Sequence, residues 1–174
     1  MTTAAVPRVR LAPATCSDAG ELIRGHLESR AHHHPWAAPF TDQAGFEVWF
    51  GRILTGPHLG LVAREAQSGE VVGIVNLSQI VFTPFARGAF LAYHGMVALA
   101  GRGLMTEAVG LAVAHAFGPL GLHRLEANVQ PANTRSLALI KRLGFRREGF
   151  SPRYLRLDGD WRDHERWALL ADDA

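Results

Sequence analysis

A glycine-flanked arginine, Gly101-Arg102-Gly103, lies where an apolar, strand-like run over 90–97 gives way to a helical pattern. Glycine has no Cβ, so backbone amides there can come close to a bulky anion. The N-terminus of the following helix adds N–H groups without intrahelical partners and the positive end of its dipole. These features predict a phosphate or pyrophosphate site, formed by Gly101, Arg102, Gly103, Leu104, Met105 and Thr106.

Two common nucleotide-binding motifs do not fit this corner. A dinucleotide-binding loop needs Gly-x-Gly-x-x-Gly after an N-terminal strand, whereas position 106 is threonine and the corner lies past the middle of the chain. A loop of the Walker type needs Gly-Lys-Ser/Thr, and the single lysine is Lys141. The remaining alternative to an anion site is a tight turn that only needs small residues.

The elements that must position this corner follow from the hydrophobic pattern. Ser17-Asp18 predicts the start of a helix that carries Leu22, Ile23 and Leu27 inward. The order of elements predicts one domain over residues 1–174, of the α+β class, with a mixed sheet and helices on both faces. Strands are predicted over 6–14, 59–66, 71–81, 90–97, 123–129, 154–157 and 161–170, and helices after Ser17, Thr41, Gly103 and Asn133.

Composition excludes several classes of protein. Nearly half of the 174 residues are apolar and a fifth are charged, as in ordinary globular proteins. The single Cys16 rules out an internal disulfide and a multi-cysteine metal site, and no stretch approaches twenty apolar residues. The net charge is only +2, and no Arg/Lys run accompanies an aromatic platform. We therefore expect a cytoplasmic protein whose partners include neither nucleic acid nor a membrane.

Three adjacent histidines, His32 to His34, suggest a metal site at first sight. Neighbouring positions on a loop cannot all converge on one ion without strain, and no carboxylate lies nearby. We therefore expect no bound metal in this protein.

The glycine corner resembles the acetyl-CoA corner of the GNAT N-acetyltransferases, which carry Arg/Gln-x-x-Gly-x-Gly/Ala between a strand and a helix. Gly101 and Gly103 match this pattern, while Ala98 stands at the Arg/Gln position, so Arg102 is expected to supply the missing charge. The second half of the chain and the loop over 30–36 resemble the RimJ/RimL branch of that family. The matching segments are 121–128, 133–136, 142–145, 148–150 and 158–164.

The resemblance covers about the whole chain and implies a GNAT fold with a mostly antiparallel sheet. It also implies acetyl-CoA as cosubstrate, no metal, and acetyl transfer to a primary amine. The RimJ/RimL branch acetylates protein N-termini, its named members act on ribosomal proteins, and the likeness is greatest to the ribosomal-protein-alanine type. Further expected CoA contacts are Met96, Val97 and Ala98 by their backbone, and Asn128, Asn133 and Ser136.

Ser136 is the expected proton donor to the departing thiolate, since many GNAT enzymes have a tyrosine where this chain has Ile140. A general base is harder to find, because RimL-type enzymes have a glutamate where this chain has Leu155. Glu107 is a candidate catalytic carboxylate, although its place in a first helical turn also suits a structural role. The lack of an obvious strong base favours an α-amine as acceptor. The neutral fraction at pH 7 is roughly a tenth for an α-amine with a pKa near 8, but only about four parts in ten thousand for a lysine amine.

The acceptor is expected in a groove between the loop over 30–40 and the final hairpin, with His32, Trp36 and Tyr154 as walls. A protein N-terminus is the preferred acceptor, and a small-molecule amine, an antibiotic or a polyamine, is the alternative. The changed residues at positions 98, 140 and 155 leave a third possibility, a catalytically silent CoA-binding module. The chain is expected to be a monomer or a homodimer.

Overall fold

The computed structural model describes residues 7–174, so the start of the first predicted strand, residue 6, lies outside the described residues. A seven-stranded sheet runs in the order β1-β2-β3-β4-β5-β7-β6. Every neighbouring pair is antiparallel except β4 and β5, which run parallel. The strands are β1 (Val9–Pro13), β2 (Leu59–Glu65), β3 (Val71–Phe82), β4 (Arg87–Gly95), β5 (Arg124–Val129), β6 (Arg146–Leu157) and β7 (Asp160–Leu170).

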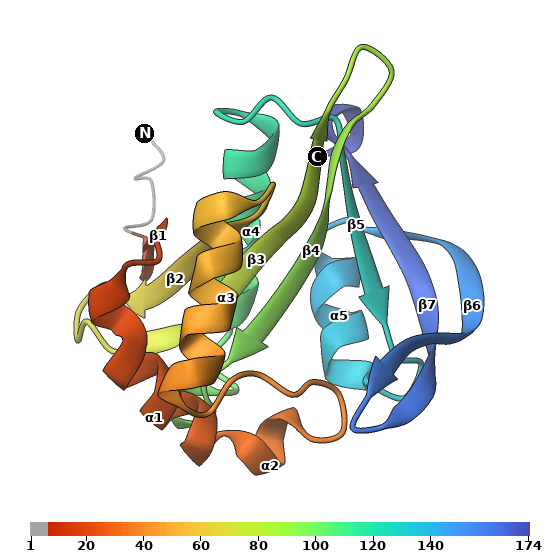
Figure 1. Cartoon of the computed structure of the whole chain (residues 1–174). Coiled ribbons are helices and arrows are strands. Elements are labelled where there is room, and N and C mark those ends of the chain that lie inside the picture. The colour runs from red at the N-terminus through yellow and green to blue at the C-terminus, as the bar shows by residue number, and fades with distance from the viewer. Residues whose placement is uncertain (1–6) are drawn as a thin grey trace.

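Helices cover both faces of the sheet (Figure 1). The buried residues form two clusters, one joining the sheet to α4 and α5 and the other joining it to α1 and α3. This mixed α+β architecture confirms the predicted fold class. The helices are α1 (Ala19–Glu28), α2 (Arg30–His33), α3 (Gln43–Thr55), α4 (Leu104–Phe117) and α5 (Thr134–Arg142).

Two helix starts follow from capping chemistry that is visible in the sequence. The Asp42 side chain accepts the N–H of Gly45 at 2.7 Å at the start of α3. The Asn133 side chain accepts the N–H of Ser136 at 3.2 Å at the start of α5, as predicted. A capping side chain satisfies an N–H that has no partner inside the helix.

Three local predictions were wrong. Leu27 is exposed rather than inward, because the buried face of α1 consists of Ala19, Leu22 and His26 and Leu27 lies outside that face. The strand before the final turn begins at Arg146, not near 154, because β6 is an exposed edge strand whose residues do not alternate strongly. The three histidines are not all on a loop, since His32 and His33 belong to the short helix α2.

The parallel pair β4 and β5 separates along its length. Only Gly88, Ala89 and Phe90 of β4 pair with β5, at Arg124, Leu125 and Glu126. Beyond these residues β4 and β5 form no hydrogen bonds with each other, so the backbone groups on their facing edges are free for a ligand. In Figure 1 the two strands part toward the end that carries α2 and the N-terminus of α5.

Within residues 7–174, no helix is long and apolar enough to cross a membrane.

Candidate active site

A cleft of about 1140 Å³ occupies the gap between β4 and β5 and continues to the N-terminus of α4. Its floor and walls come from four regions of the chain: the α2 segment, the end of β4 with the corner after it, β5 with the first turns of α5, and the final hairpin. The site residues that line it are His32, Trp36, Met96, Val97, Gly101, Gly103, Leu104, Met105, Thr106, Asn128, Asn133 and Ser136.

The glycine corner has the backbone that an anion site requires. Gly101 has φ +78° and Gly103 has φ +76°, a left-handed conformation that side chains with a Cβ rarely adopt. Gly103 is the N-cap residue of α4. Among the described residues, no backbone acceptor is found for the N–H groups over 101–106, so these donors point to a ligand or to water.

Two residues expected at this corner do not face the cleft. The Arg102 guanidinium forms an ion pair with Glu65, at the end of β2, and neither Arg102 nor Ala98 lines the cleft. Arg102 therefore does not supply the positive charge that was predicted for the anion site, because its guanidinium pairs with Glu65. An anion at this corner would be held by the backbone amides and the helix dipole.

Glu107 lies in a structural junction outside the cleft, which does not fit the catalytic role expected for it. Its Oε1 accepts the N–H groups of Arg8 at 2.7 Å and Val9 at 3.2 Å, and its Oε2 accepts Arg8 Nε at 3.0 Å. These contacts tie the start of β1 to the first turn of α4. Both carboxylate oxygens are hydrogen-bonded in this junction, and Glu107 does not line the cleft.

The segment after β4 also departs from the prediction. The strand ends at Gly95, and Val97–Leu99 forms a turn of 3₁₀-helix. The Met96 N–H donates to the Val72 carbonyl at 2.8 Å, and the Val97 N–H donates to Ser29 Oγ at 2.9 Å. These two amides are not free for a ligand, so the unpaired edges of β4 and β5 offer the available backbone groups.

The Ser136 hydroxyl has a partner that the sequence did not reveal. Tyr93 Oη on β4 lies 2.6 Å from Ser136 Oγ and donates to the Ser136 carbonyl at 3.3 Å. Burial raises the pKa of Tyr93 to about 12, so the phenol keeps its proton at neutral pH. Both residues line the cleft. The pair places two hydroxyl groups side by side where β4 and the N-terminus of α5 meet.

The other face of the sheet contributes polar groups of a different kind. Gln130 donates to the carbonyls of Pro35 and Trp36, at 3.5 and 3.3 Å, which brings the α2 segment over the cleft. Asn128 Oδ1 is buried without a hydrogen-bond partner among the described residues.

His164 on β7 also lines the cleft, although it was not predicted as a site residue. Tyr154 does not line it and packs against the His164 ring instead, with ring centroids 6.1 Å apart.

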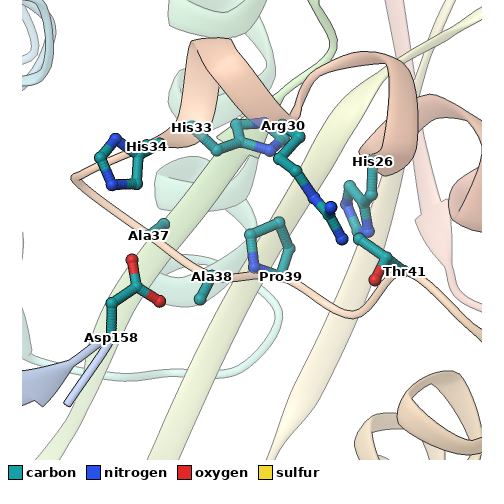
Figure 2. A pocket seen from close by; sticks show the side chains of 9 residues that line it. All are labelled: His26, Arg30, His33, His34, Ala37, Ala38, Pro39, Thr41 and Asp158. Carbon is teal, nitrogen blue, oxygen red and sulfur yellow. The ribbon is translucent and has the colours of Figure 1, made fainter.

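A second hollow of about 460 Å³ adjoins the cleft and shares His33, Ala37 and Ala38 with it. Figure 2 shows its two sides, with Arg30 and His26 on the helical segments and Asp158 on the turn between β6 and β7. The hollow lies between the segment over 30–41, which includes α2, and the final hairpin, where the acceptor groove was predicted.

Three histidine rings meet beside this hollow. The ring of His26 lies 5.8 Å from His33 and 6.2 Å from His94, and His33 lies 5.8 Å from His94. His26 is fully buried, its Nδ1 bonds the Phe40 carbonyl at 2.9 Å, and its Nε2 has no partner among the described residues. Burial lowers the pKa of His26 to about 4. Among residues 7–174, no group of three or more His, Cys, Asp or Glu residues is arranged to hold a metal ion.

Acid should therefore destabilise the fold through this cluster. The unfolded chain binds a proton at His26 near pH 6.5 and the folded chain only near pH 4, so stability is complete above pH 6.5 and is lost as the pH falls toward 4. His26→Gln should make the decrease in free energy of unfolding between pH 7.5 and 5 smaller by about 2 kcal/mol. Urea denaturation at both values measures it, with His123→Gln, an exposed histidine, as control. Equal pH dependence in the wild type and H26Q would contradict this assignment.

The parted strands, the glycine corner and the fold define a GNAT acetyltransferase. Residues 8–146 match the family described as Acetyltransferase (GNAT) domain, and the chain belongs to that family. It is an N-acetyltransferase, as the resemblance in its motifs predicted.

The chain is similar over almost its whole length to several N-acetyltransferases. It is 32% identical to the [ribosomal protein uS5]-alanine N-acetyltransferase of Escherichia coli, over 97% of this chain and 94% of that protein. The structure of Mycobacterium smegmatis RimJ in complex with CoA-disulfide has 31% identity and a TM-score of 0.83, covering 94% of this chain and 82% of that one. Spermidine N-acetyltransferase from Vibrio cholerae, in complex with CoA and spermine, shares the fold at 19% identity, with a TM-score of 0.81 and coverage of 95% and 97%.

Proposed function

We propose that this chain, as a single domain, transfers the acetyl group of acetyl-CoA to the α-amine of a protein N-terminus, preferably an N-terminal alanine. The observation that favours a peptide over a polyamine acceptor is that none of the described residues lining the cleft is acidic. The similarity to an enzyme that acetylates the alanine of a ribosomal protein supports it.

The proposed cosubstrate site runs from the glycine corner into the gap between β4 and β5. The free amides over 101–106 bind the diphosphate, and the pantetheine arm extends along the unpaired strand edges toward Ser136. Asn133 caps α5 beside the arm, and Ser136 and Tyr93 meet the thioester sulfur. M. smegmatis RimJ holds a CoA derivative in its structure, which supports this placement.

The charged residues around the cleft favour a peptide acceptor over a polyamine. Spermidine and aminoglycosides carry several positive charges and need several carboxylates to bind. The described lining of the cleft has no Asp or Glu but contains Arg135 and Arg142, and the adjoining hollow adds Arg30 and one carboxylate, Asp158. A polycation would lie among arginines with a single negative partner, so its binding is unfavourable. A peptide brings one ammonium group, and the rest of its backbone is neutral.

A direct assay with two acceptors tests the proposal. We expect a peptide that begins with alanine to be acetylated with a kcat/KM at least 100-fold higher than spermidine, with release of the CoA thiol measured by a thiol reagent. The same peptide with its α-amine blocked and one internal lysine serves as the control and should be inactive.

The other outcomes identify the alternatives. Faster turnover of spermidine or an aminoglycoside would establish a small-molecule enzyme and overturn the peptide acceptor. Tight CoA binding without turnover of any amine would indicate a silent CoA-binding module. The free Cys16 fits a reducing compartment, so we expect the enzyme to act in the cytoplasm, and monomer or homodimer is the expected state.

A further inference from the structure

An ammonium group must lose a proton before it can attack the thioester, and none of the described residues that line the cleft is Asp or Glu. Imidazole is then the strongest proton acceptor available at neutral pH. Four histidines line the cleft: His32, His33, His94 and His164. Their hydrogen bonds and positions distinguish them.

Three of the four are poor candidates. His33 Nε2 bonds the Gly95 carbonyl at 2.8 Å, and its Nδ1 is sealed from solvent without a partner. His32 Nδ1 lies 3.4 Å from the Arg135 guanidinium, and this cation would repel a positive charge on the His32 ring. Burial lowers the pKa of His94 to about 3, about five units below that of an α-amine. Such an imidazole cannot hold the proton of an ammonium group.

His164 differs in the nitrogen that it presents. Its Nδ1 lies 3.0 Å from the Arg162 carbonyl oxygen. A carbonyl can only accept a hydrogen bond, so Nδ1 carries the hydrogen and Nε2 carries the lone pair. The residue is only 3% exposed but lines the cleft, and the Tyr154 ring holds it in place from β6. The side chain is thus a neutral, fixed imidazole with one free acceptor nitrogen.

Asn128 places an acceptor atom on the same face of the sheet. Asn128 pairs with Arg166 in the ladder between β5 and β7. Directly opposed residues share a face, and residues two apart on a strand share it too, so His164 lies on the face of Asn128. The buried Asn128 Oδ1 has no partner among the described residues and lines the cleft. A buried carbonyl oxygen without a donor is unfavourable until a ligand N–H fills it.

Ser136 and Tyr93 lie on the opposite face. Tyr93 contacts α5, whereas its neighbour His94 contacts His26 of α1, because successive residues of β4 point to opposite faces. An acetyl group in the gap between β4 and β5 would therefore meet the two hydroxyls on one side and Asn128 with His164 on the other. The amine can attack from one face while the sulfur departs on the other.

We propose that His164 Nε2 is the general base of the reaction and that Asn128 Oδ1 accepts a hydrogen bond from the amine. The assignment rests on the proposed amine acceptor. His164 takes one proton from the ammonium group, and the nitrogen lone pair forms the C–N bond as the C–S bond breaks. The departing sulfur takes the hydrogen of the Ser136 hydroxyl, which regains one from water, and the second amine proton is lost to water. His164 then releases its proton to water.

The groups around His164 are compatible with this role. The charged neighbours on its own strand are Arg162, Asp163, Glu165 and Arg166. Asp163 Oδ1 accepts the Arg153 N–H at 2.7 Å, and Arg162 and Arg166, each two residues from His164, lie on its face of the sheet. From β6 the ring faces Tyr154, and on β5 the uncharged Asn128 lies on the same face of the sheet. Burial lowers the pKa of His164, and the bond to the Arg162 carbonyl and the charge of Asp163 oppose that shift. The imidazole is therefore neutral at pH 7.

The pH dependence of His164→Gln tests the assignment, with His94→Gln as the matched variant from the same cleft. At pH 7, kcat/KM for the alanine peptide should fall about tenfold in H164Q, because only roughly a tenth of the α-amine is neutral without a base. At pH 9.5 the wild type and H164Q should agree within about twofold, because the amine is then deprotonated by solvent. Affinity for acetyl-CoA should be unchanged.

Other results would overturn the proposal. These are an equal loss in H164Q at both pH values, no loss at pH 7, or a pH-dependent loss in H94Q and not in H164Q. Nitrogen-15 NMR of the wild type gives a second test that needs no turnover, since it should show the hydrogen of His164 on Nδ1; a hydrogen on Nε2 at pH 7 excludes the role. If the wild type acetylates no peptide, the proposed acceptor is wrong. The role of His164 is then still decided by the NMR result and by the pH dependence of H164Q with whichever amine is acetylated.

Discussion

Gly101→Val should reduce the affinity for acetyl-CoA by at least about 100-fold, or about 2.7 kcal/mol. Valine at φ +78° strains the backbone of the corner, and its side chain enters the space from which the diphosphate must approach the amides. A Cβ at position 101 would meet no atom of the described chain within 4 Å. The unliganded fold can therefore accommodate the residue, and the loss falls mainly on the ligand. Calorimetric titration with CoA measures it.

Gly121→Val is the matched control for this variant. Gly121 also has a left-handed backbone, with φ +61°, and a Cβ there would also meet nothing within 4 Å. It follows the far end of α4 and does not line the cleft. Both variants should lose about 1–2 kcal/mol of stability through backbone strain, but G121V should bind CoA normally. If G101V keeps its affinity, the corner does not bind the diphosphate.

Ser136→Ala should lower kcat by about 100-fold and leave the affinity for acetyl-CoA within about twofold. Loss of a group that donates a proton in the transition state affects the chemical step rather than ground-state binding. Tyr93→Phe removes the phenol that lies 2.6 Å from the serine hydroxyl and should lower kcat about tenfold. Steady-state kinetics with the alanine peptide measures both changes.

The double variant tests whether the two hydroxyls act together. If Tyr93 acts by holding Ser136, then Y93F should have little further effect in S136A, and the two losses should not add. Additive losses would show that Tyr93 acts independently of the serine. Ser136→Cys restores a donor of similar size and should recover part of the rate. A fully active S136A would remove Ser136 from the mechanism.

The sequence by itself determined the parts of this protein that depend on local backbone conformation. The corner was predicted from Gly101 and Gly103, which adopt a left-handed backbone in the structure, and Asn133 caps the helix that was predicted to follow it. The order of strands and helices also follows from local periodicity, and it was sufficient to predict the α+β sheet. With its motifs, the sequence indicated the family to which the chain belongs.

Only the tertiary structure decided which side chains face the cleft. Glu107 contacts Arg8, 99 residues away, and Arg102 contacts Glu65, 37 residues away. Tyr93 reaches Ser136 across 43 residues, and His164 shares a face with Asn128 through the register of β5 and β7. Such contacts depend on strand register and on which face each residue occupies, and a shift of one residue reverses the face. Local patterns do not carry that information, so the donor pair and the proposed base emerged only when the sheet was assembled.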